Sequence, residues 1–115
     1  MKKITDINTA IHIFKDAADR QAKAIEIGDY NQANKCYDQI TKVVTFLKDN
    51  NALLELQPLL TNDSVGIRLW AACYLLRVDE KKAITVLEEI SNLKGIHSLT
   101  AKTTIKEWRK GNIKT

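Results

Sequence analysis

Residues 65–77 read VGIRLWAACYLLR, a run that is apolar around most of a helical circumference. A surface helix keeps one polar side, whereas a helix that is apolar all round is buried. We therefore predict that residues 65–77 form a central, buried helix.

Helical patterns flank this run on both sides. Apolar residues recur there at three-and-four spacing, which is typical of one buried helical stripe. Pro58 interrupts the segment just before the central run, so the helix there should be short or kinked. The predicted helices begin or end near Asp6 and Gly28, Asp29 and Lys48, Leu53 and Leu60, Val65 and Arg77, Asp79 and Ile90, and Ser98 and Gly111.

The links between these helices are very short. Gly28 can take the positive φ of a residue just after a helix, and Asp29 with Gln32 forms a capping-box pattern for the next helix. Short links force neighbouring helices to run antiparallel. The prediction is an all-α fold, a short right-handed α-α superhelix of about six antiparallel helices. It is expected to be a single domain over residues 1–115, with 113–115 as a frayed tail.

Composition narrows the class of protein. The chain has 115 residues, of which 44% are hydrophobic and 28% charged, and only one proline and four glycines punctuate it. These values fit one globular domain and argue against an all-β fold. No apolar stretch follows Met1–Ile4, so no signal peptide is expected, nor any membrane span, and a cytoplasmic location is predicted. Cys36 and Cys73 are then expected to be reduced thiols, although one disulfide between them remains an alternative.

The stretch from Leu53 to Ile90 resembles a HEAT-type repeat. The resemblance is carried by Leu56–Leu60 with its proline, Asn62-Asp63, Ile67–Leu69, Ala71-Ala72 and Leu75, and then by Asp79, Ala83, Leu87 and Ile90. In such a repeat Asp63 and Arg68 should hydrogen-bond across the turn between them. The stretch from Ala24 to Tyr37 is similar to the turn of a tetratricopeptide repeat.

As a whole the chain looks like a small bacterial family of unknown function with a HEAT-like, armadillo-type helical fold. The residues that carry this likeness are Gln21, Gly28-Asp29, Asn34-Lys35, Tyr37, Asp38, Leu59–Arg68 and Ala71-Ala72. The resemblance implies a helical interaction protein, and such proteins are sometimes encoded beside secreted bacterial toxins as immunity proteins. The basic C-terminal end departs from the acidic surface expected of an inhibitor aimed at a nuclease.

Catalytic signatures are absent from the sequence. No Ser/His/Asp order, phosphate-binding glycine loop or HExxH pattern occurs. His12 has Asp16 one helical turn away, and His97 is expected in a loop. Neighbouring Glu88 and Glu89 point in different directions on a helix. We expect no enzyme activity, no metal and no cofactor.

Two surfaces are candidates for partner binding. Trp70, Tyr74 and Arg77 are spaced i, i+4 and i+7, so they follow one side of the central helix, where aromatic and arginine side chains would form a binding hot spot. The structural alternative is that both rings pack against a neighbouring helix. Asn34, Asp38 and Lys42 on the second helix, and Gln21 on the first, either bond between helices or face a partner.

The second surface is basic. Residues 93–115 hold six basic side chains and one acidic one, whereas residues 1–92 hold 12 basic and 13 acidic. Lys102, Lys106 and Lys110 repeat every four residues opposite the apolar stripe of the last helix. They could meet phosphates or an acidic protein, or form only a solvated face.

The leading hypothesis is a non-enzymatic protein–protein interaction module with an unidentified protein partner, in its specific form a toxin-immunity or inhibitor protein. The alternative is binding of nucleic-acid phosphates through the basic C-terminal helix. We expect the protein itself to be a monomer or weak homodimer.

Overall fold

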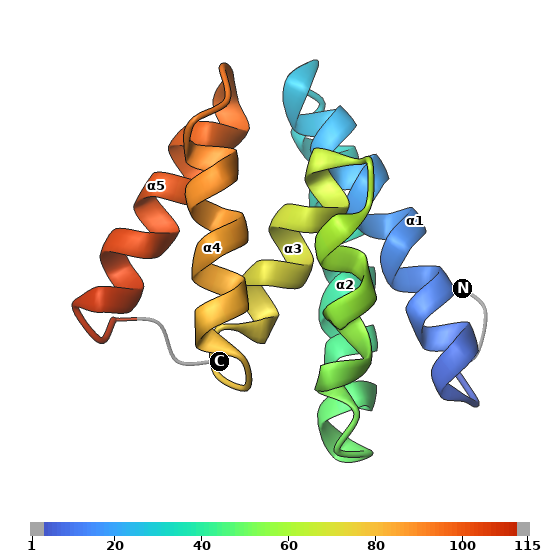
Figure 1. The fold of residues 1–115 in the computed structure, drawn as a ribbon. Coiled ribbons are helices and arrows are strands. Elements are labelled where there is room, and N and C mark those ends of the chain that lie inside the picture. Colours follow the sequence, from blue (N-terminus) through green and yellow to red (C-terminus); the bar gives the residue numbers. More distant parts are fainter. Residues whose placement is uncertain (1–3, 113–115) are drawn as a thin grey trace.

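The computed structural model describes residues 4–112, and this part of the chain forms six helices and no strand (Figure 1). The tail predicted at 113–115 lies outside the described residues. In chain order the helices are α1 (Ile7–Glu26), α2 (Tyr30–Asp49), the 3₁₀ helix η1 (Leu53–Thr61), α3 (Val65–Leu75), α4 (Glu80–Ser91) and α5 (Ile96–Arg109). The all-α prediction is therefore confirmed.

Helix α3 lies at the centre, as its all-round apolar sequence predicts. It packs against α1, η1, α4 and α5. Figure 1 shows it crossing between the α1–α2 pair and the α4–α5 pair. Leu69, Ala71, Ala72 and Leu75 are buried on it. One continuous cluster of buried side chains then runs through all six helices, with members such as Phe14, Ile40, Leu47, Leu56, Leu75, Leu87 and Ile105.

The first hairpin follows the sequence signals closely. The Asp6 carboxylate accepts a hydrogen bond from the Thr9 amide at 2.7 Å and caps α1. Gly28 adopts φ 77°, and the Asp29 carboxylate accepts the Gln32 amide at 3.2 Å. The Gln32 side chain instead approaches the sulfur of Cys36 at 3.7 Å, so the described bonds contain the Asp29 half of the capping box.

The helix that contains Pro58 is short, as predicted, and it is a 3₁₀ helix. Three residues per turn bring positions i and i+3 to the same side. Leu53, Leu56 and Leu59 have this spacing and are buried, whereas Leu54 is 50% exposed. The leucine spacing and the missing amide of the proline together favour this tighter helix over an α-helix.

Three helix ends differ from the expected positions. α3 ends at Leu75, so Arg77 lies in the following turn. Asp79 precedes α4, but its carboxylate accepts a 2.6 Å hydrogen bond from the Gln57 amide and caps no backbone group. α5 begins at Ile96 instead of Ser98, because Gly95 takes φ 112° and the Ser98 hydroxyl bonds back to the Gly95 carbonyl within the first turn.

Both cysteines are free; Cys36 is buried and Cys73 partly buried. Within residues 4–112, no helix is both long and apolar enough to cross a membrane.

Candidate functional site

The predicted aromatic pair on α3 belongs to an aromatic cluster that spans three helices. The rings of Trp70 and Tyr74 stack at 6.0 Å with an interplanar angle of 20°. Tyr37 of α2 approaches Trp70 at 5.7 Å, and Phe14 of α1 meets Tyr74 edge-on at 6.4 Å. The structure thus places both α3 rings against the first hairpin, which is the packing alternative considered from the sequence.

Hydrogen bonding and burial hold this cluster in place. The indole nitrogen of Trp70 donates to the side-chain oxygen of Gln21 on α1 at 2.9 Å, so Gln21 makes an interhelical bond. Burial, followed by the proximity of Tyr37, raises the pKa of Tyr74 to about 12. Its phenol therefore stays protonated at neutral pH. Tyr37 is 44% exposed and is the ring through which the cluster meets solvent.

Arg77 is separated from the helical register of these rings. It follows the end of α3 and lines a depression at the ends of α2 and η1 with Lys48, Leu54 and Val78. The expected alignment of Arg77 with Trp70 and Tyr74 requires a helix that continues to residue 77, and α3 ends at Leu75.

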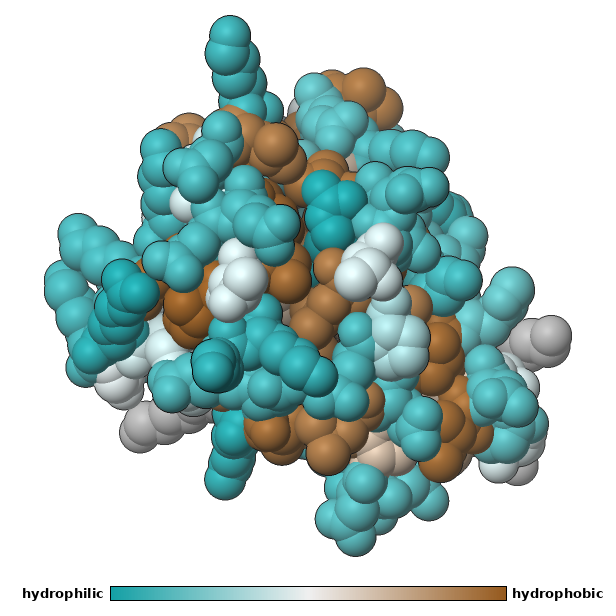
Figure 2. All heavy atoms as spheres, viewed as in Figure 1, coloured by the Kyte–Doolittle hydropathy of each residue, from teal (hydrophilic) through white to brown (hydrophobic). Residues whose placement is uncertain are grey.

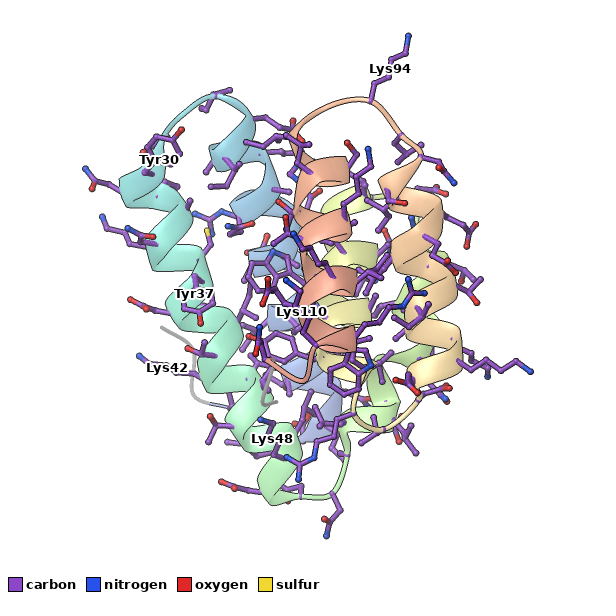
Figure 3. All side chains as sticks on the ribbon, turned by 90° about the vertical axis from the view of Figure 1, so that its left-hand side faces the viewer. Tyr30, Tyr37, Lys42, Lys48, Lys94 and Lys110 are labelled. Atoms are coloured by element: carbon purple, nitrogen blue, oxygen red, sulfur yellow. The ribbon has the colours of Figure 1, made fainter. Side chains whose placement is uncertain are left out.

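The predicted basic ridge is exposed along α5. Lys102, Lys106 and Lys110 are all exposed, and Figure 3 shows Lys110 on the same face of the molecule as Tyr37. Part of the neighbouring charge is compensated by α4, since Arg109 lies 3.8 Å from the Glu88 carboxylate. The indole of Trp108 donates to Glu80, which ties the end of α5 to the start of α4.

The histidines are placed apart. His12 is exposed, and Asp16, its expected partner, pairs instead with Arg20 at 3.4 Å. His97 lies in the first turn of α5 and not in a loop, and its Nε2 is 2.8 Å from the Glu26 carboxylate of α1. In the described part of the chain, no three His, Cys, Asp or Glu side chains gather where they could hold a metal ion.

Asn34, Asp38 and Lys42 on α2 are exposed, which leaves them facing outward rather than bonding between helices. Arg68 does bridge the turn before α3 as expected. Its partners are the backbone carbonyls of Asn62 at 2.7 Å and Asp63 at 3.1 Å, and not the Asp63 carboxylate.

A groove that the sequence reasoning missed lies between η1 and α4. It encloses about 840 Å³, within the usual range of ligand-binding clefts. In Figure 2 brown hydrophobic atoms form the floor of this region, between the teal rims of the two helices. Its lining residues are Gln57, Leu60, Thr61, Asn62, Asp63, Arg68, Lys81, Lys82, Thr85, Val86, Glu89 and Leu93.

No contiguous sequence signal marks this groove, because its two walls are separated by α3 and meet only after α3 has crossed the molecule. The one local hint is Leu93, a large apolar residue directly after α4 that is 49% exposed. Leucines at such positions are common, so the hint by itself identifies nothing.

No protein family matches this sequence, and no curated protein does so. The fold is shared with a solved structure, the crystal structure of the protein RPA1889 from Rhodopseudomonas palustris CGA009. The two superimpose with a TM-score of 0.88 over 98% of this chain and 99% of that chain, at 21% sequence identity. At this identity the likeness establishes the fold, and we conclude that the chain adopts the small all-helical fold of RPA1889.

Proposed function

We propose that the protein is a non-catalytic interaction module that binds a segment of a partner protein in the η1–α4 groove. The observation that carries this proposal is the groove itself. Leu60 and Val86, each more than nine-tenths buried, supply an apolar floor, and the half-exposed Leu93 extends it. Polar side chains on both walls can fix the orientation of a bound segment, which is how peptide-binding grooves combine affinity with specificity.

The finer fold belongs to this proposal. We propose a single HEAT-like domain with a short right-handed superhelix, in keeping with the HEAT-type pattern of residues 53–90. The order of packing supports it, because α3 lies between η1 and α4, and α4 pairs with α5. Repeat proteins of this kind bind partners along extended surfaces. An immunity or inhibitor role, with a toxin as partner, is the specific form of the proposal, and it rests on the resemblance alone.

The surface predicted at Trp70, Tyr74 and Arg77 has less support than the groove. Trp70 and Tyr74 contact each other and rings of α1 and α2, so much of their area is already used within the molecule. The exposed side of Tyr37 is the part of this cluster that a partner could reach first.

The test is capture of partners by the immobilised protein from native extract, with a variant that fills the groove. Thr85→Trp places a bulky neutral ring in the lining. Thr45→Trp on α2 is the matched control, because both threonines are exposed and each bonds the carbonyl four residues earlier at 2.9 Å. We expect a captured protein to be lost with Thr85→Trp and retained with Thr45→Trp. Capture that is equal in both variants, or no capture at all, contradicts the proposal.

Nucleic-acid binding by the C-terminal ridge is the second candidate. The observation in its favour is that Lys102, Lys106 and Lys110 are exposed and make no ion pair with any residue of 4–112. Uncompensated cations at regular spacing along a helix suit a phosphate backbone.

A further inference from the structure

The charges around the η1–α4 groove are unevenly distributed. Lys81 and Lys82 lie in the first turn of α4 and line one end. Neither forms an ion pair within the described part of the chain. Glu89 lies seven residues after Lys82, which is about 10 Å along a helix. The end of the groove at Lys81 and Lys82 is therefore purely cationic in its ionised lining.

The position of these two lysines costs α4 some stability. Cations in the first turn of a helix oppose the helix dipole. Asp79, the nearest acidic residue before the helix, is engaged by the Gln57 amide at 2.6 Å and does not cap the helix. An anionic group bound in the groove would offset both effects, since it would meet the lysines and the positive end of the dipole together.

The other end of the groove presents a fixed guanidinium. One terminal nitrogen of Arg68 is held by the carbonyls of Asn62 and Asp63. Its other nitrogens bond to no residue among 4–112. A guanidinium that is already held in place loses little entropy when it binds a carboxylate, and it can do so with two parallel hydrogen bonds.

Two acidic residues, Asp63 and Glu89, also line this groove, against the three basic residues Arg68, Lys81 and Lys82. The balance is one net positive charge. Between the cationic ends lies the apolar floor formed by Leu60 and Val86. The complementary ligand is thus apolar in the middle and acidic at its ends.

We propose that the partner segment is a short acidic peptide whose central apolar side chains cover Leu60 and Val86 and whose flanking carboxylates meet Lys81, Lys82 and Arg68. This inference rests on the proposed function of the groove. From Lys81 to Leu93 the wall formed by α4 and its last residues is about 18 Å long. An extended segment of about six residues fills that length.

The test uses fluorescein-labelled peptides of about this length, each with a pair of leucines in the middle and with glutamate, lysine or serine flanks. Binding to the full chain is followed by fluorescence polarisation. We expect the glutamate-flanked peptide to bind at least about tenfold more tightly than the other two at low salt, and the difference to shrink as salt is added. The double variant Lys81→Glu/Lys82→Glu should lose that preference.

Two control variants separate this inference from the proposed function. Lys102→Glu/Lys106→Glu makes the same charge change on α5 and should leave the preference intact, whereas Thr85→Trp should abolish binding of every peptide. Equal binding of the three peptides that Thr85→Trp still blocks overturns the acidic ligand while keeping the groove as a peptide site. Absence of binding by any peptide overturns the inference as well, and the capture experiment then judges the proposed function on its own.

Discussion

Gly66 of α3 lies directly against Ala22 of α1. A side-chain carbon added at Gly66 would come within 2.4 Å of the Cβ of Ala22 and 2.9 Å of the Ala18 carbonyl oxygen. The central helix therefore approaches the first hairpin at a distance that only glycine permits. This contact sets how the two parts of the molecule join.

Replacing this glycine by alanine should destabilise the fold. Gly66→Ala gains up to about 1 kcal/mol of helix propensity. Overpacking of a tight contact costs typically about 1–3 kcal/mol, so we expect a net loss of roughly 1–2 kcal/mol in the free energy of unfolding. Urea denaturation followed by circular dichroism measures it. The double variant Ala22→Gly/Gly66→Ala should recover part of the loss, and a double variant whose losses simply add would contradict the contact.

Removal of the Gln21 side-chain oxygen should leave the Trp70 indole without its partner. We expect Gln21→Leu to lower the free energy of unfolding by about 1 kcal/mol, the usual net value of such a bond. In the background Trp70→Phe, which has no N–H to satisfy, the same change should cost less. A double-mutant cycle from chemical denaturation gives the coupling, and a coupling of zero would refute the bond between α1 and α3.

Acid should weaken the link between Asp19 and its neighbours. Hydrogen bonds from Lys23 first and from Ser64 second hold the pKa of Asp19 below its ordinary value of 3.8. Because the folded pKa is the lower one, this stabilisation is complete above the unfolded pKa and is lost as pH falls below 3.8 through the folded value.

Asp19→Asn should therefore flatten the acid side of the stability–pH curve, measured by urea unfolding from neutral pH to below 3.8. Asp38→Asn is the control, because that exposed carboxylate makes no side-chain hydrogen bond to residues 4–112. Equal flattening by both variants would show that Asp19 contributes nothing specific.

The Cys73 thiol should resist alkylation at neutral pH. Burial raises its pKa to about 11. At pH 8 roughly one thiol in a thousand is then ionised, and the thiolate is the reactive form. In the variant Cys36→Ala, the rate of reaction with iodoacetamide should rise about tenfold per pH unit through pH 10. Mass spectrometry measures the rate, and a plateau near pH 8.5, as for a free thiol, would contradict the effect of burial.

The basic ridge has a direct test in a mobility-shift assay with short duplex DNA. If Lys102, Lys106 and Lys110 contact phosphates, binding is independent of sequence and weakens steeply with salt. Replacing all three by alanine should then abolish the shift. Replacing Lys35, Lys42 and Lys48 on α2, which are equally exposed, removes the same charge and should leave it. A probe that does not shift at low salt rules out this second candidate.

The sequence by itself determined the helical content and the order of the helices. The apolar run of residues 65–77 identified the central helix, because a segment with no polar side has to be surrounded. Asp6, Gly28 and Asp29 marked helix ends correctly, since caps and positive-φ glycines act within a few residues of chain. These features are local, and local chemistry suffices to predict them.

The candidate site could be predicted only in part. Helical spacing placed Trp70 and Tyr74 on one side of α3, but it left open whether a neighbouring helix or a partner covers that side. Tyr37 and Phe14 supply the cover, and both come from the first hairpin, far away in sequence. The periodicity of one helix carries no information about which other helix lies against it.

Tertiary structure alone decided the groove and the joints between the two parts of the molecule. The walls of the groove come from η1 and α4, which α3 brings together as it crosses. The bonds from Gln21 to Trp70 and from Glu26 to His97 likewise join residues far apart in the chain. The physical reason is the close approach at Gly66 and Ala22, because the crossing of α3 over α1 depends on how near two packed helices come, and a pattern read along the chain does not contain that distance.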